Sequence, residues 1–261
     1  MDANLAFNNS IFILRNSLLS GDNLVDLLKE ADHHLEVTKR FNINLSMPIL
    51  LAYRETISVL IDKGTSLKED IQTESNNNPH HEQHHALQKN LNKVLQTFWS
   101  GYTSRCKYFV QKVLEDRRLG PMNRDLVLFY AAINSFRGVK NSNASQFQKF
   151  KPLYDDALTA LRTAVLLNPT QINKVHLLEA ELCSFQMRDD HALLNYNAAI
   201  RTSTYIHELG LAYESAGLHL KKRGNVVEAL SYFHQAKECY TRWGSQVKVD
   251  SIVEQMNRLS Q

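Results

Sequence analysis

A repeated small–large–small pattern in the last third of the chain constrains its fold more than any other feature. An alanine is followed four positions later by a large apolar residue, and three positions after that by a second alanine. The three copies are Ala157/Leu161/Ala164, Ala192/Tyr196/Ala199 and Ala229/Phe233/Ala236. Their first alanines lie 35 and 37 residues apart (192 − 157; 229 − 192), close to the ~34-residue period of tetratricopeptide repeats. The pattern predicts antiparallel helical hairpins, each burying its apolar face against the next.

Small residues also stand where a partner helix of each hairpin must approach closely. Ala180 and Gly217 precede the first alanine of the last two copies by twelve positions each (192 − 180; 229 − 217). Gly224 is placed at the hairpin bend of the last copy, and Pro169 follows the helix of the first. These positions fit a stack in which the two helices of a hairpin are in tight contact.

Apolar residues at three- and four-residue steps continue through most of the remaining sequence, which predicts amphipathic helices. The expected segments are 3–19, ended by Gly21; a second helix capped by Asp22; a third from Ser46 to Gly64; one over 94–113; and one over 123–137, followed by a loop at 138–150. With only 9 glycines and 5 prolines in 261 residues, a turn-rich β fold is disfavoured. The predicted fold is all-α: about eleven helices in a right-handed, TPR-like stack of hairpins (an α-solenoid).

Three regions are expected along the chain. Residues 1–62 form an N-terminal helical block and residues 92–261 the TPR-like repeats. Between them, residues 63–91 are rich in histidine and asparagine, and apolar side chains are scarce at 63–85. Such a stretch cannot offset the entropy of ordering, so we expect a flexible polar insertion.

Composition excludes several functional classes. Thirty Lys+Arg against 27 Asp+Glu give a net charge of only +3, which argues against a protein that binds nucleic acid. Three widely spaced cysteines, at 106, 183 and 239, form neither a disulfide framework nor a metal pair, and we expect Cys183 and Cys239 to be inert core thiols. We find no signal peptide and no apolar run that would span a membrane. The expectation is a cytoplasmic protein that binds neither membrane nor nucleic acid.

The C-terminal sequence resembles a known family. The stretch Cys239-Tyr240-Thr241-Arg242-Trp243-Gly244-Ser245-Gln246-Val247-Lys248-Val249 matches the Cys-Tyr-x-x-Trp-Gly-x-x-x-Lys-Val motif that closes the helical array of large bacterial and fungal signalling proteins. In those proteins the array lies between a Ser/Thr-kinase-like domain with an AAA-type ATPase and a GAF domain with a sensor histidine kinase. Leu177–Glu181 and Tyr196–Ile200 also resemble its repeats. The resemblance is specific from about Leu177 onward.

The resemblance implies a connector rather than an enzyme. No P-loop, protein-kinase motif or sensor-kinase nucleotide box occurs in the sequence, so the parent family's catalysis is not carried over. We therefore expect no catalytic, cofactor-binding or metal-binding residues. The expected role is a scaffold for protein–protein interaction and signal relay, with neighbouring signalling modules as partners.

Two alternatives remain open. In the first, the chain is a free-standing adaptor that binds a partner peptide in a concave groove, supported weakly by Asn173, Lys174 and Lys222. In the second, it is a zinc hydrolase, because His81-Glu82-Gln83-His84-His85 contains the His-Glu-x-x-His string of zincins. The string lies in the most polar part of the chain, so a solvated loop is the favoured interpretation.

Other conspicuous residues have structural explanations. Lys221-Lys222-Arg223 suits a helix C-terminus, and Tyr240 and Trp243 follow the apolar period of the repeat and are expected in the core. Glu179 and Glu181 are two apart on a helix and should face different sides. The remaining histidines (33, 34, 176, 207, 219 and 234) share no nucleophile and are expected at the surface or as buried, hydrogen-bonded residues.

Overall fold

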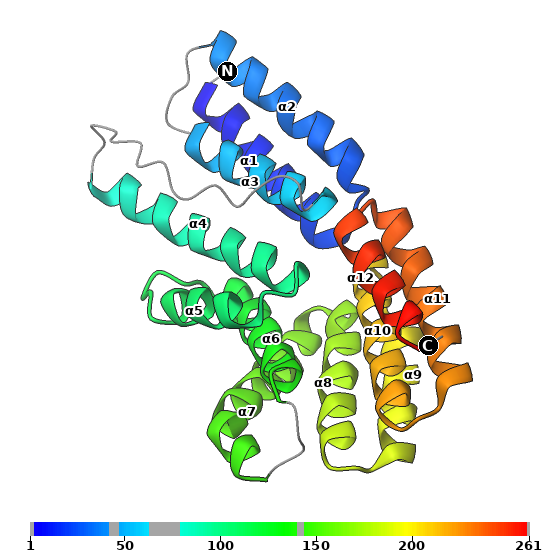
Figure 1. Ribbon diagram of the computed structural model, residues 1–261. Helices are drawn as coiled ribbons and strands as arrows, with labels where there is room; N and C mark the ends of the chain where they lie inside the picture. The colour runs from blue at the N-terminus through cyan, green and yellow to red at the C-terminus, as the bar shows by residue number, and fades with distance from the viewer. Residues whose placement is uncertain (1–2, 42–46, 63–78, 140–143, 260–261) are drawn as a thin grey trace.

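The computed structural model describes residues 3–41, 47–62, 79–139 and 144–259, and it is all-α over these ranges (Figure 1). The described chain forms twelve α-helices, one 3₁₀ turn and no strand. The helices are α1 (Ala3–Ser20), α2 (Leu24–Arg40), α3 (Met47–Ile61), α4 (Pro79–Trp99), α5 (Thr103–Leu114), α6 (Pro121–Arg137), α7 (Ala144–Leu167), α8 (Ile172–Phe185), α9 (Asp189–Thr202), α10 (Ile206–Lys222), α11 (Val226–Trp243) and α12 (Gln246–Asn257), with the 3₁₀ turn η1 (Pro169–Gln171) between α7 and α8.

Helices that follow one another in the chain pack side by side, and the most extensive pairs are α8 with α9 and α10 with α11 (Figure 1). The repeated alanines lie inside these pairs. Ala157, Ala192 and Ala229 are fully buried, and Tyr196 and Phe233 are at most 1% exposed. The small–large–small pattern thus marks the buried side of α7, α9 and α11.

The sequence predicts a close approach of two helices at Gly217, and the structure places α10 and α11 in tight contact there. A Cβ atom placed on Gly217 of α10 would lie 2.8 Å from the ring of Phe233 in α11. A Cβ atom on Gly210, about two turns earlier on the same face of α10, would meet the Tyr240 ring at 2.7 Å. Any side chain at either position would push α10 and α11 apart, so the two glycines set the spacing of this hairpin.

Polar contacts between hairpins recur at a nearly constant sequence separation. Ser184 contacts His219, Asn173 contacts Glu208, and the Tyr232 hydroxyl donates to Asn197, each 35 residues apart. Lys221 to Gln255 and Lys248 to Glu214 span 34 residues. A stack of repeated hairpins brings equivalent positions of neighbours together, and this constant separation is what such a stack requires.

The last helix also packs against the N-terminal part of the chain. Helix α12 contacts α3, and Figure 1 shows α2 and α3 beside the red and orange helices α11 and α12. The Ser245 hydroxyl donates to the Leu60 carbonyl (2.6 Å), and the Asn23 amide donates to the Arg242 carbonyl (2.9 Å). In an open solenoid each repeat touches only its neighbours, whereas this chain adds a contact between segments 185 residues apart.

An aromatic cluster joins α4 and α6 to the hairpin of α10 and α11. The Trp99 ring in α4 is 5.0 Å from that of Trp243 in α11 and 5.5 Å from that of His207 in α10. Tyr130 of α6 and Tyr240 of α11 lie 6.0 and 6.4 Å from Trp99. Offset and edge-on pairs at these distances add to the stability gained by burial, so the cluster ties four helices together.

Several helix boundaries differ from the sequence-based expectation. Asn23, not Asp22, caps α2, since its side chain accepts the Val25 and Asp26 amides. The single helix predicted over 94–113 is two helices, because Gly101 has a φ of 78° and ends α4. The residues from Ala144 that were predicted as loop belong to α7.

The predicted insertion at 63–91 has a helical C-terminal part. Residues 63–78, including the predicted helix end at Gly64, lie outside the described residues, and so does the predicted cap Ser46. From Pro79 onward the chain is helical. Leu87 is 7% exposed and Leu91 packs against the core. Helix α4 therefore has an apolar side, although the sequence before it is mostly polar.

Within the described residues, no helix is both long enough and apolar enough to span a bilayer.

Candidate functional site

A ladder of buried ion pairs joins the even-numbered helices of the array. Lys174 of α8 pairs with Glu208 of α10 at 2.5 Å, and Glu214 of α10 pairs with Lys248 of α12 at 2.7 Å. The side chains of these four residues are at most 8% exposed. Arg137 of α6 lies 3.4 Å from Glu214. We call these five residues the charge ladder.

The charge ladder changes the interpretation of two residues that the adaptor hypothesis needed in a groove. Asn173 and Lys174 are 3% and 2% exposed, and both contact Glu208 inside the array. They therefore do not line a groove as a carboxylate clamp would require, and that expectation is corrected. Lys222, the third residue, is exposed at the end of α10.

Glu214 is a carboxylate of the charge ladder with three partners. Burial by itself would raise the pKa of Glu214, but the Lys248 ammonium and the Arg137 guanidinium outweigh it and lower the pKa to about 2. The Tyr240 hydroxyl donates to the same carboxylate at 2.6 Å. Glu214 is thus charged at neutral pH and bonded to groups from three other helices.

Glu181 of α8 has the opposite character. Burial raises the pKa of Glu181 above its ordinary value, while Arg137 and the hydroxyls of Ser215 and Tyr196 act against that rise. Glu179, two positions earlier, instead pairs with Arg162 at 2.8 Å. The two carboxylates therefore face different sides of α8, as the helical spacing predicts, and do not form an acid–base pair.

His207 is a buried histidine held next to the charge ladder. Its side chain is 2% exposed and stacks on Trp243 with 5.2 Å between ring centroids. Burial lowers the pKa of His207 to about 4, with Glu208 opposing this shift. His207 is therefore a neutral core residue at pH 7.

An open groove lies between the first two hairpins of the repeat region. Helix α7 contributes Tyr154, Leu158 and Arg162, helix α8 contributes Glu179, Leu182 and Cys183, and the following turn and α9 contribute Arg188, His191 and Asn195. The groove has a volume of about 400 Å³, within the size range of ligand-binding pockets. Its size makes it a candidate for contact with another molecule.

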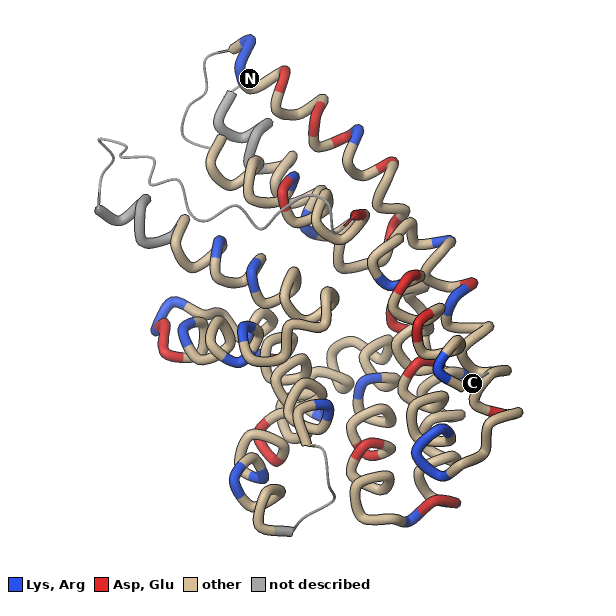
Figure 2. Tube along the Cα trace, in the orientation of Figure 1, with Lys and Arg blue, Asp and Glu red and all other residues tan. Residues whose placement is uncertain are grey.

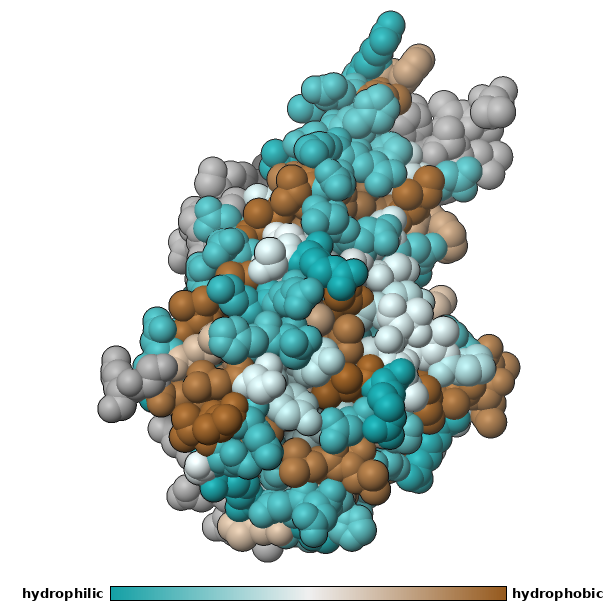
Figure 3. Space-filling model, turned by 90° about the vertical axis from the view of Figure 1, so that its right-hand side faces the viewer, coloured by the Kyte–Doolittle hydropathy of each residue, from teal (hydrophilic) through white to brown (hydrophobic). Residues whose placement is uncertain are grey.

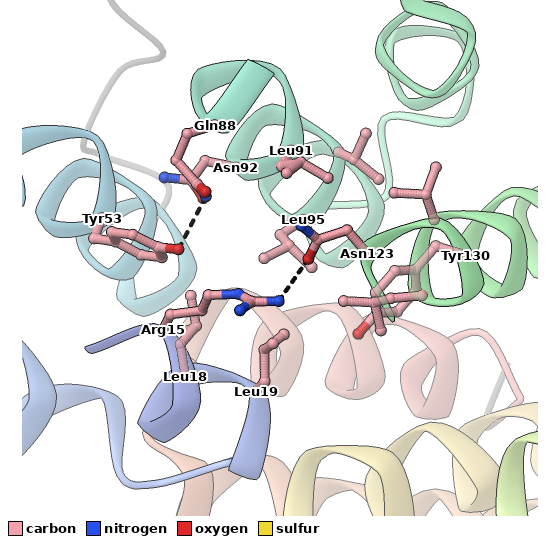
Figure 4. A pocket seen from close by; sticks show the side chains of 13 residues that line it. Arg15, Leu18, Leu19, Tyr53, Gln88, Leu91, Asn92, Leu95, Asn123 and Tyr130 are labelled. Carbon is pink, nitrogen blue, oxygen red and sulfur yellow. Dashed lines mark hydrogen bonds between the residues drawn. The ribbon is translucent and has the colours of Figure 1, made fainter. Parts of the chain in front are cut away.

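A second, much smaller cavity lies between the N-terminal block and the repeats (Figure 4). Arg15 donates to Asn123 at 2.6 Å on one side, and Gln88 donates to the Tyr53 hydroxyl at 2.9 Å on the other. The cavity measures about 20 Å³, room for about one water molecule. Its polar groups therefore serve to join α1, α3, α4 and α6.

Most of the His-Glu-x-x-His string predicted as a zinc site lies outside the described side chains. The side chains of His81 and Glu82 lie outside the described residues, and His85 is half-buried in α4. Among the side chains that the structure does describe, no group of three or more His, Cys, Asp or Glu residues is arranged to hold a metal ion.

Tyr240, Trp243 and the three cysteines lie in the core. Tyr240 and Trp243 are at most 1% exposed. Cys106, Cys183 and Cys239 are buried free thiols, and burial raises the pKa of the first and last to about 11. In the basic run at the end of α10, Arg223 pairs with Asp189 at 2.7 Å.

The exposed surface mixes charges and apolar residues. Both acidic and basic residues lie along α2 (Figure 2). Figure 3 shows apolar residues in separate patches among hydrophilic ones on the face it presents. Exposed apolar side chains of the repeat region include Leu166, Leu167, Met187 and Leu194.

Comparisons with known proteins identify no relative. No family model matches the chain, no curated protein matches it, and no solved structure matches it.

Proposed function

We propose that this chain is a non-catalytic helical-repeat scaffold for protein–protein interaction and signal relay. In this proposal it acts in the cytoplasm as a connector between signalling modules, as the ATPase and GAF/histidine-kinase modules are connected in the sensor kinases that its C-terminal sequence resembles. Its partners are proteins, and it binds neither nucleic acid nor membrane.

The charge ladder is the observation that supports the relay. Lys174–Glu208 and Glu214–Lys248 link α8 to α10 and α10 to α12, both inside the protein. Breaking one partner of a buried pair leaves an uncompensated charge at a cost of several kcal/mol. The helices are therefore held in one register, and a displacement of α8 would be passed to α12 rather than absorbed between them.

Hydrogen exchange measures this coupling directly. Lys174→Met breaks the first link of the charge ladder, and amide exchange should then rise in α12, which Lys174 does not contact, and not in α5. The matched control is Lys151→Ala, which removes an exposed pair with Asp155 on α7. If Lys174→Met raised exchange in α8 and α10 alone, the relay proposal would fail.

The non-catalytic part of the proposal has a separate test. Purified chain is incubated with labelled ATP, and phosphate release and incorporation into the protein are measured. We expect both to equal those of a heat-inactivated sample. Hydrolysis or autophosphorylation that follows the folded chain through purification would refute this part.

The adaptor hypothesis keeps one observation in its favour. The buried Asn173 and Lys174 no longer support a clamp, but the open groove between α7 and α9 is large enough for a short peptide. We therefore place any peptide-binding activity of the scaffold in this groove.

A further inference from the structure

The groove between α7 and α9 exists because one position lacks a large side chain. At the next junction, between α9 and α11, the Tyr232 hydroxyl donates to Asn197 at 2.9 Å and joins the two helices. The repeat offsets of 37 and 35 residues (232 − 195; 197 − 162) place Asn195 at the position of Tyr232 and Arg162 at that of Asn197. Asn195 and Arg162 both line the groove. The chain thus contains a closed and an open version of the same junction.

Two hydrogen-bond donors in the open junction converge on a weak acceptor. The Arg188 guanidinium lies 3.3 Å from the Cys183 Sγ atom, and the Asn195 amide, which also donates to the His191 carbonyl at 3.0 Å, lies 4.0 Å from it. A thiol accepts hydrogen bonds poorly, whereas a carboxylate is the natural bidentate partner of arginine. Arg188 forms no ion pair within the described part of the chain, whereas Arg162 pairs with Glu179.

The lining of the groove combines this positive charge with an apolar floor. Arg162 and Glu179 neutralise each other, which leaves Arg188 as the uncompensated charge among the lining residues. Leu158 and Leu182, both half-buried, line the same groove. A ligand that fits must therefore supply one carboxylate and, beside it, an apolar side chain.

The backbone is strained at Met187, the residue before Arg188. Met187 has a φ of 59°, the left-handed region, which costs a non-glycine residue roughly 1–2 kcal/mol. The equivalent position of the next hairpin (187 + 37 = 224) holds Gly224 with a φ of 78°. Strain that persists in a folded protein points to a functional site, and here the Met187 side chain is 61% exposed next to Arg188.

We propose that this groove binds a short segment of a partner protein that carries an aspartate or glutamate followed by apolar residues. The carboxylate pairs with the Arg188 guanidinium and replaces the Cys183 thiol as its acceptor. The apolar side chains lie on Leu158 and Leu182. The proposal rests on the scaffold function in naming one of its docking surfaces, and it involves no residue of the charge ladder.

Peptide pools test the ligand class. Three pools of fluorescent hexapeptides carry glutamate, glutamine or lysine at the third position, followed by two positions drawn from Leu, Ile and Phe. Fluorescence anisotropy should show that the glutamate pool binds at least about tenfold more tightly than the other two, the effect of about one charge-assisted hydrogen bond. Equal binding of the three pools, or no binding of the glutamate pool up to about 1 mM, would overturn the proposal.

The closed junction supplies the variants. Asn195→Tyr imports the residue of the closed junction, and Arg188→Asn imports Asn225, the equivalent of Arg188 (225 − 188 = 37). Each should weaken binding of the glutamate pool at least about tenfold, while Arg188→Lys retains part of it. Leu194→Tyr, an exposed position on α9 that does not line the groove, is the matched control and should bind as wild type does.

Each outcome decides the proposal separately from the scaffold function. If Asn195→Tyr fails to fold, as circular dichroism would show, the Arg188 variants still give the answer. Wild-type binding by Arg188→Asn would refute the groove, and so would tight binding of oligouridine RNA in place of the glutamate pool. Neither result would change the hydrogen-exchange test of the charge ladder, which uses the chain without peptide.

Discussion

Glu214 and Lys248 lie 34 residues apart and form a buried ion pair at 2.7 Å between α10 and α12. Their separation equals one structural repeat, so the pair holds two successive hairpins in register. Removing one partner of such a pair costs more than removing both, since the remaining charge stays buried. The pair thus specifies how the hairpins align more than it adds to net stability.

Lys248→Met should therefore lower the free energy of unfolding by about 3 kcal/mol. The double variant Lys248→Met/Glu214→Gln should recover part of that loss, because the Glu214 carboxylate is then no longer buried without Lys248, while Arg137 loses its partner at 3.4 Å. Urea denaturation of the two single variants and the double variant at pH 7 gives the coupling energy. Losses that simply add in the double variant would show that the two residues do not interact.

Much of the fold could be predicted because small residues recur at the helix contacts of its repeat. Ala192 and Ala229 mark buried helix contacts by their size alone, and Gly217 marks a close approach of α10 to α11. The break between α4 and α5 escaped prediction because Trp99, Tyr102 and Cys106 continue the apolar period through Gly101. Only the backbone angle of Gly101 separates the two helices.

The candidate site was harder to predict, and for a physical reason. Asn173 and Lys174 are hydrophilic, and a single sequence suggests that such residues face solvent. Their burial depends on Glu208, which lies one repeat away, so each residue is intelligible only once its partner is placed. The contact between Leu60 and Ser245 spans 185 residues, and no local pattern reports such a contact.

His207 gives the protein a stability that depends on pH. Its folded pKa of about 4 lies below the unfolded value of 6.5, so the unfolded state binds the proton more tightly. The stabilisation is fully present above pH 6.5 and is lost as the pH falls towards 4, in total about 3 kcal/mol. His207→Phe should flatten the unfolding free energy over this interval in thermal or urea denaturation.

The control for this effect is His234, which is exposed on α11. His234→Gln should leave the pH profile of the unfolding free energy as it is in the wild type. If the unfolding free energy of His207→Phe depended on pH as steeply as that of the wild type, His207 would be protonated as readily in the folded protein as in the unfolded chain.

Gly217 should tolerate no side chain while Phe233 is present. Gly217→Ala places a Cβ atom 2.8 Å from the Phe233 ring, and overpacking of this kind costs about 1–3 kcal/mol. Adding Phe233→Leu to the alanine variant should restore part of the stability, because the smaller side chain leaves room. Chemical denaturation measures both, and a Gly217→Ala protein as stable as the wild type would contradict the tight contact.

Met187 offers a test of strain that is independent of ligand. Met187→Gly removes the Cβ atom that disfavours a φ of 59° and should stabilise the fold by up to about 1 kcal/mol, since part of the relief is offset by the greater entropy of glycine in the unfolded chain. The reverse change at the equivalent turn, Gly224→Met, forces the same strain where no side chain obstructs it and should destabilise by about 1 kcal/mol. Melting temperatures of the two variants should thus move in opposite directions, and a fall for both would mean that the Met187 side chain stabilises its turn through contacts that outweigh the backbone strain.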